Sequence, residues 1–179
     1  MTERLVLRRW RAEDLEPFSA LCADEAVMEY FPQPLTREQS DDLAGRADAL
    51  FDSKGYGLWA LERRDTGEFI GFTGLAPMPS GIPGAGGVEV GWRLARAHWG
   101  HGFATEAARE TLAFAFGERG LTEVSSITAT INLRSRAVME RIGMTLADEF
   151  EHPALARGSR LRAHVRYLIG QPLTARTDR

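Results

Sequence analysis

The spacing of apolar and polar residues changes several times along the chain, and each spacing predicts a type of element. Alternation over residues 3–10 predicts a strand, because successive strand side chains point to opposite faces. Residues 12–30 and the stretch from 36 to about 52 carry apolar residues at helical spacing. Thr36 and Gln39 form a capping-box pattern, which indicates where the second of these helices begins.

Strands and helices alternate in the remainder of the chain. Further strands are predicted at residues 58–62, 69–75, 88–94, 123–131, 144–150 and 160–169. Further helices are predicted from residue 103 to about 118 and from 132 to 142. This order favours a mixed α/β sheet with helices on both faces. We expect one domain over residues 1–170 and a flexible polar tail at 171–179.

Composition and charge exclude some classes of protein. The formal net charge of −3 argues against a general binder of nucleic acid or of membrane surfaces. The single cysteine, Cys22, cannot form an intrachain disulfide and is typical of a reducing compartment. No apolar run approaches the length of a membrane span, and the N-terminus does not resemble a signal peptide. We therefore expect a cytoplasmic protein without nucleic-acid or membrane partners.

The strand at 88–94 runs into a turn that contains Gly100 and Gly102, and this turn opens into a helix. Glycine lets the backbone bend tightly and approach a ligand. The first amides of a helix lack intrahelical partners and carry the positive end of its dipole. The turn is therefore a candidate site for a phosphate or pyrophosphate, although a short G-x-G alone is weak evidence.

Several other segments, taken together with this turn, indicate a protein family. They are Glu89-Val90-Gly91-Trp92, the run from Trp99 to Ala107, Asn132-x-x-Ser135 with Arg141-Ile142-Gly143-Met144, Tyr30-Phe31-Pro32, and His164-Val165-Arg166-Tyr167. With them the chain resembles the GCN5-related N-acetyltransferase (GNAT) superfamily. The resemblance extends to its Rim-type branch, which comprises ribosomal-protein N-terminal acetyltransferases and their relatives.

The resemblance implies a fold and a reaction. The fold would be a mostly antiparallel sheet of about six to seven strands with about four helices, splayed open at the acetyl-CoA site. The reaction would move the acetyl group of acetyl-CoA to a primary amine, either a peptide N-terminus or a small-molecule amine, without a metal. The residues that would bind acetyl-CoA are Trp92, Leu94, Trp99, Gly100, His101, Gly102, Phe103, Ala104, Thr105, Asn132, Arg134 and Arg136.

Two positions depart from the superfamily pattern. Ala97, beside Arg96, stands where the loop usually has Gln or Arg, which is a small loss because backbone amides do most of the phosphate binding. Met139 stands where many members have a tyrosine that acts as general acid. Ser135 lies one helical turn earlier on the same face, and a serine there has this role in the Rim-type branch.

Glu89 is the candidate base. It shares one face of its strand with Gly91 and Arg93, and a carboxylate in a half-apolar cleft should have a raised pKa. The alternative is a structural glutamate paired with Arg93 or with a loop arginine. Ser135 is the candidate proton donor to the leaving thiolate, and its alternative is a role at the helix N-terminus beside the N-cap Asn132.

The other candidates also have two interpretations. Tyr30, Phe31 and Trp59 are predicted to line the acceptor pocket, although core aromatic residues look the same in sequence. Arg134 and Arg136 are candidate phosphate contacts or solvated surface charges. Cys22 lies on an apolar helix face, which favours a buried structural cysteine and direct attack in a ternary complex over an acetyl-enzyme.

Two other classes of function compete with the enzyme. One is a domain that binds acetyl-CoA as a sensor without turnover, against which the presence of both Glu89 and Ser135 argues. The other is a dinucleotide binder that uses Gly100-x-Gly102 with Glu123 on the ribose, but that motif belongs near the start of a parallel βαβ array. The sequence leaves a homodimer open.

Overall fold

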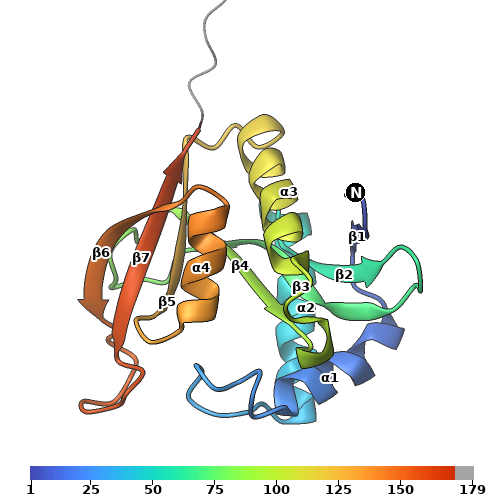
Figure 1. Cartoon of the computed structure of the whole chain (residues 1–179), viewed down its shortest axis with the longest axis horizontal. Helices are drawn as coiled ribbons and strands as arrows, with labels where there is room; N and C mark the ends of the chain where they lie inside the picture. Colours follow the sequence, from blue (N-terminus) through green and yellow to red (C-terminus); the bar gives the residue numbers. More distant parts are fainter. Residues whose placement is uncertain (172–179) are drawn as a thin grey trace, which may run out of the picture.

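One sheet crosses the whole molecule in this computed structural model, which describes residues 1–171 (Figure 1). Within these residues the sheet has seven strands in the order β1-β2-β3-β4-β5-β7-β6. Their bounds are β1 Leu5–Arg8, β2 Leu58–Arg63, β3 Phe69–Pro77, β4 Val88–Leu94, β5 Glu123–Ala129, β6 Thr145–Glu151 and β7 Ala163–Gly170. Neighbouring strands are antiparallel except β4 and β5, which confirms the expected mixed sheet. Residues 172–179 of the expected tail lie outside the described residues.

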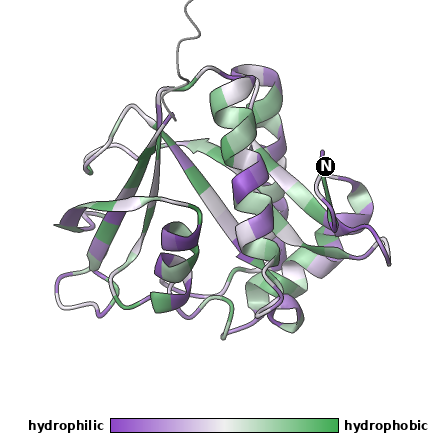
Figure 2. Ribbon diagram, turned by 45° about the horizontal axis from the view of Figure 1, so that its top comes forward, coloured by the Kyte–Doolittle hydropathy of each residue, from purple (hydrophilic) through white to green (hydrophobic). Residues whose placement is uncertain are grey.

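Four α-helices in the described part of the chain cover the two faces of the sheet. They are α1 Leu15–Ala23, α2 Arg37–Lys54, α3 Phe103–Gly117 and α4 Leu133–Arg141, with short 3-10 turns at Ala12–Asp14 and Arg96–His98. Residues of α3 and α4 share one buried cluster, and residues of α1 and α2 share another. Figure 2 shows hydrophobic strands in the middle of the molecule and many hydrophilic residues on α4.

The first predicted helix is shorter than expected. α1 ends at Ala23, because Asp24 has extended backbone angles and its carboxylate accepts a hydrogen bond from the Ala26 amide (2.8 Å). Residues 24–36 form a loop instead. The capping box that opens α2 is confirmed, since the Thr36 hydroxyl accepts from the Gln39 amide and the Gln39 side chain accepts from the Thr36 amide.

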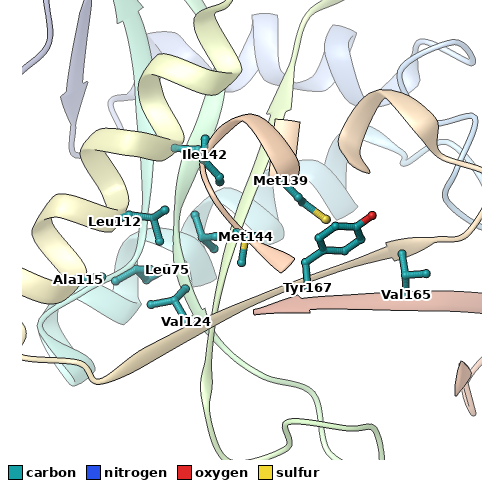
Figure 3. Packing of buried hydrophobic residues seen from close by; sticks show 11 residues of the cluster. Leu75, Leu112, Ala115, Val124, Met139, Ile142, Met144, Val165 and Tyr167 are labelled. Carbon is teal, nitrogen blue, oxygen red and sulfur yellow. The ribbon is translucent and has the colours of Figure 1, made fainter. Parts of the chain in front are cut away.

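Met139, which stands where many superfamily members have a tyrosine, is part of the core under α3 and α4. Its side chain is fully buried in the cluster that includes Leu112, Val124 and Tyr167, and it lies beside the Tyr167 ring (Figure 3). A thioether packs well in an apolar core. The side chain at this position therefore fills the core and does not reach the cleft described below.

The sheet is splayed between β4 and β5. Glu89 and Ser125 are the one pair of residues that these parallel strands share in the described structure, and beyond them the strands diverge (Figure 1). On the other side of β4 the antiparallel pairing with β3 continues over its whole length. The β5-facing edge of β4 is therefore left without a strand partner, as expected for the splayed sheet.

Candidate active site

A cleft of about 1780 Å³ lies where β4 and β5 diverge. It is lined by β4, the turn into α3, the start of α4 and the loop at residues 24–36. A cavity of this size exceeds the usual range for small ligands, which suits a long donor together with an acceptor. The predicted site residues that line it are Tyr30, Phe31, Glu89, Trp92, Leu94, Trp99, Gly100, Gly102, Phe103, Ala104, Thr105, Asn132, Arg134 and Ser135.

The turn before α3 has the geometry of an anion site. Gly100 and Gly102 have φ angles of 78° and 80°, which side chains other than hydrogen rarely allow. No side chain among residues 1–171 caps α3 at Gly102, so its first amides lack a capping acceptor there. A Cβ on Gly100 would meet nothing within 4 Å. The free amides and open space have the size and polarity that a phosphate group needs.

The exposed edge of β4 can bind an extended ligand. Backbone amides and carbonyls along this edge face the cleft without a strand partner, and such groups favour hydrogen bonds with an added strand-like segment. The last of them is an exception, because the Leu94 carbonyl accepts a hydrogen bond from Trp99 Nε1 (2.9 Å). Trp92 therefore offers the freer backbone of the two predicted residues.

The start of α4 separates the roles of Asn132 and Ser135. The Asn132 side chain accepts from the Ser135 amide (3.2 Å) and donates to Thr128 Oγ1 (2.9 Å). Asn132 is thus the N-cap, and Ser135 supplies its backbone to the cap while its side chain lines the cleft. The capping alternative accounts for the Ser135 amide and leaves the hydroxyl available for chemistry.

Glu89 is a half-buried carboxylate at the point where β4 and β5 separate. Burial, acting alone, raises its pKa from 4.5 to about 7. The alternative pairing with Arg93 is not formed among residues 1–171, where the Arg93 guanidinium contacts the Cys22 sulfur instead (3.3 Å). A Cβ on Gly91 would meet nothing within 4 Å, so there is space beside Glu89 for an amine or a water.

Three predicted residues lie outside the cleft. Trp59, expected in the acceptor pocket, packs between the rings of Phe51 and Phe114 (5.2 and 5.0 Å). Arg136, expected on a phosphate, donates to the Thr130 carbonyl and the Tyr167 hydroxyl. These local partners hold both side chains away from the cleft, and we remove them from the candidate site.

The third, His101, is exposed and stacks on Phe103 (5.8 Å), so its backbone lies in the glycine turn while its ring does not line the cleft. Arg134, by contrast, does reach the cleft. Its guanidinium lies 4.7 Å from the centre of the Trp99 ring, which joins the start of α4 to the glycine turn.

The cleft also contains residues whose sequence pattern indicated no role in binding. His152 and His164 line the cleft from β7 and the loop before it, with their rings 4.9 Å apart. Burial lowers the pKa of each, so both imidazoles favour the neutral form. Arg93 also lines the cleft. Its alternation with Glu89 and Gly91 was the signal that could have identified it.

Other kinds of site find no support in the described residues. Residues 1–171 contain no group of three or more His, Cys, Asp or Glu side chains placed to hold a metal ion. No helix in the same range has both the length and the hydrophobicity that crossing a membrane requires.

Comparisons with known proteins agree with this geometry. The family model described as the acetyltransferase (GNAT) domain matches residues 4–145. The uncharacterized protein YkkB of Bacillus subtilis (strain 168) is 35% identical over 147 residues, which are 80% of this chain and 83% of that protein. The FsC-acetyl coenzyme A-N(2)-transacetylase of Aspergillus fumigatus is 35% identical over 156 residues, which are 83% of this chain and 66% of that protein.

A solved acetyltransferase from Agrobacterium tumefaciens (strain C58) is similar over nearly the whole fold. It is 29% identical, with a TM-score of 0.78, over 96% of this chain and 93% of that chain. The splayed sheet, the glycine turn at the start of α3 and the match of the family model all agree. The chain belongs to the GNAT acetyltransferase family, whose members use acetyl-CoA.

Proposed function

We propose that this protein is an acetyl-CoA-dependent N-acetyltransferase that acetylates a primary amine by direct attack in a ternary complex. The observation that carries the proposal is Glu89, a carboxylate with no counter-ion among the described residues, at the apex of the splayed sheet and with a pKa of about 7. A base with a pKa near the working pH combines the correct protonation state with a useful driving force. A domain that only senses acetyl-CoA has no need of this group.

The cleft divides into a donor half and an acceptor half. The amides at the start of α3 would hold the pyrophosphate of acetyl-CoA, while Trp92 and Asn132 would bind its pantetheine arm. When bound, acetyl-CoA supplies an activated thioester. Tyr30 and Phe31 would line the acceptor half, on the side of β4 that carries Glu89 and Arg93.

Two side chains would move protons in the proposed reaction. Glu89 takes a proton from the acceptor ammonium, directly or through water, which frees the nitrogen lone pair to attack the acetyl carbonyl. As the carbon–sulfur bond breaks, the Ser135 hydroxyl donates a proton to the departing sulfur, and the second proton released by the attacking nitrogen restores the hydroxyl. Cys22 takes no part, because its side chain is buried and burial raises the pKa of its thiol.

We further propose that the chain is a member of the Rim-type branch. Ser135 lines the cleft, whereas Met139 is buried in the core and cannot donate a proton. A serine donor is what the resemblance to that branch implies. The name of the Aspergillus relative, an acetyl coenzyme A transacetylase, also supports an N-acetyl transfer.

An amine-library screen tests the proposed function. Purified protein is incubated with acetyl-CoA and one amine at a time, and released coenzyme A thiol is measured. Thiol release that depends on the amine is expected for at least one class, either peptide N-termini or small amines. Tight binding of acetyl-CoA by calorimetry without amine-dependent release would favour the sensor instead.

A further inference from the structure

Arg93 carries a half-buried positive charge for which residues 1–171 provide no anion. Its Nη1 donates to the sulfur of Cys22 (3.3 Å), and its buried Nε has no hydrogen-bond partner among residues 1–171. The guanidinium carbon lies 4.1 Å from the centre of the Phe31 ring and 5.4 Å from that of Phe72. A thiol sulfur and two aromatic faces are therefore the contacts of this cation.

These contacts do not compensate the charge. Guanidinium groups stay protonated in proteins, even though burial lowers the pKa of this one. The Cys22 thiol is no counter-ion, because burial raises its pKa and keeps it neutral. Aromatic faces supply part of the lost solvation, but a half-buried charge without an anionic partner still costs desolvation free energy. Such a site favours an anionic ligand.

The position of Arg93 indicates which ligand this is. Val90 and Leu94 of β4 pack in the clusters below α3, whereas Glu89, Gly91 and Arg93 alternate with them and face the side of α1. Arg93 lines both the main cleft and a side pocket of about 480 Å³ below Phe31 and Pro32. Asp42 also lines this side pocket, but it does not come within ion-pair distance of Arg93 in the described structure.

Two loops close over this part of the cleft. Arg160, in the segment between β6 and β7, donates to the carbonyl of Glu29 (2.7 Å) and lies 6.0 Å from the centre of the Tyr30 ring. Phe31, next in the chain, covers the Arg93 guanidinium while remaining partly exposed at 39%. Beneath these loops, Glu89 lies at one end of the acceptor half and Arg93 lies at the other.

On the basis of the proposed function, we propose that Arg93 binds a carboxylate of the acceptor, so that the substrate is an amine that also carries a carboxylate. Two parallel N–H donors of a guanidinium match the two oxygens of a carboxylate. Four residues along a strand separate Glu89 and Arg93, about 13 Å between their Cα atoms. Short peptides and ω-amino acids suit this separation better than single α-amino acids, whose two groups flank one carbon.

Matched acceptors test the role of Arg93. Alanyl-alanine and its C-terminal amide differ only in the charged carboxylate, as do ω-amino acids of increasing length and their amides. We expect the acids to have KM values roughly 10- to 100-fold lower than the amides, the range of one charged hydrogen-bonded contact. Arg93→Met should remove this preference, and Arg93→Lys should restore part of it.

Arg37→Met is the matched control, because Arg37 lies exposed on α2 in a surface ion pair with Asp41. It should keep the preference for acids. Arg93→Met should also melt at or above the temperature of the wild type, because an apolar side chain of similar length replaces a half-buried charge that has no counter-ion among residues 1–171. A structural role for Arg93 would instead lower the melting temperature and reduce kcat/KM equally for acids and amides.

A readout without turnover separates this proposal from the proposed function. The Arg93 Nε–H signal, identified by its loss in Arg93→Met, should shift on titration with the acids but not with the amides. A shift without acetylation of any amine would overturn the proposed function and support the carboxylate site. Acetylation of acids and amides at equal rates, or no shift with any acid in the series, would overturn the role of Arg93.

Discussion

Glu89 shows how one side chain acquires its chemistry from its surroundings. Its strand ends its pairing with β5 at this residue, and the next position on the same face is a glycine with open space beside it. No cation among residues 1–171 offsets its charge, so burial alone sets the direction of its pKa. These conditions hold a carboxylate near half-ionised at neutral pH, as a general base requires.

The activity of the enzyme should follow the ionisation of Glu89. We expect kcat/KM to rise with pH through a limb near 7 as the carboxyl loses its proton. Glu89→Gln should lower kcat by about 10²–10⁴-fold and remove this limb, while the affinity for acetyl-CoA measured by calorimetry stays unchanged. Glu123→Gln, an exposed glutamate at the start of β5, is the control. An unaltered pH profile in Glu89→Gln would exclude Glu89 as the base.

Glu89 should affect stability and activity in opposite directions, because folding favours its protonated form and catalysis needs its ionised form. A carboxyl with a pKa of 4.5 in the unfolded chain and about 7 in the fold stabilises the protein below pH 4.5. That contribution is lost as the pH rises to 7, and it amounts to at most about 3 kcal/mol. As the pH rises from 4.5 to 7, the free energy of unfolding of the wild type should therefore fall relative to that of Glu89→Gln. The same comparison for Glu123→Gln should show no such fall.

At the scale of elements, the turn between β4 and α3 is the feature on which donor binding depends. It combines two glycines in left-handed backbone conformations with a helix start that no side chain caps. The Trp99 indole, bonded to the Leu94 carbonyl, fixes the turn to the end of the strand. Local chemistry thus directs a set of free amides into the cleft.

Gly102→Glu should reduce the affinity for acetyl-CoA at least tenfold, measured by calorimetry. The new carboxylate would place a like charge beside the pyrophosphate and fill space that a ligand needs. Gly86→Glu is a close control, because Gly86 also has a positive φ of 87° and open space but does not line the cleft. Both variants should lose a similar amount of stability, about 1–2 kcal/mol for the left-handed backbone. Equal acetyl-CoA affinities in the two variants would contradict the role of the turn.

The helices differ in how far local sequence determines them. The capping box of α2 acts over a few residues and is found where the spacing predicts it. Gly143, with a φ of 89°, ends α4 in the same local way. α1 was predicted too long, because apolar residues continue into the loop at 24–36. Val27 and Met28 are buried there by tertiary packing and not by a helical face.

At the scale of the whole molecule, the splayed sheet joins two halves that share few contacts across the cleft. β1 to β4 with α1 and α2 lie on one side, β5 to β7 with α4 lie on the other, and α3 packs against both (Figure 1). A ligand that bonds to the edge of β4 and to the start of α4 would connect the halves. Donor binding should therefore stabilise the molecule as a whole.

Acetyl-CoA at 100 times its Kd should add about 2.7 kcal/mol to the free energy of unfolding. For a chain of this size, the melting temperature should rise by about 5–10 °C. Hydrogen exchange should slow most along β4 and at the starts of α3 and α4. Pantetheine at the same concentration, which lacks the pyrophosphate, should give a smaller shift. Protection concentrated in β1 and β2 would place the donor elsewhere and contradict the proposed site.

Local sequence was enough to predict the order of the elements, the positions of the caps, the glycine turn and the common face of Glu89, Gly91 and Arg93. These features depend on backbone preferences and on periodicity within one element, which act over a few residues. The family resemblance rests on the same local segments. Most of the predicted cleft residues are therefore found in the cleft.

Packing between distant elements determines which side chains meet and which lose their contact with solvent. It placed Trp59 between Phe51 and Phe114, buried Met139, brought His152 and His164 to the cleft, and separated Arg93 from Glu89. Contacts between residues distant in the sequence, and the burial that shifts a pKa, depend on how elements pack across the sheet. No periodicity within a single element contains that information.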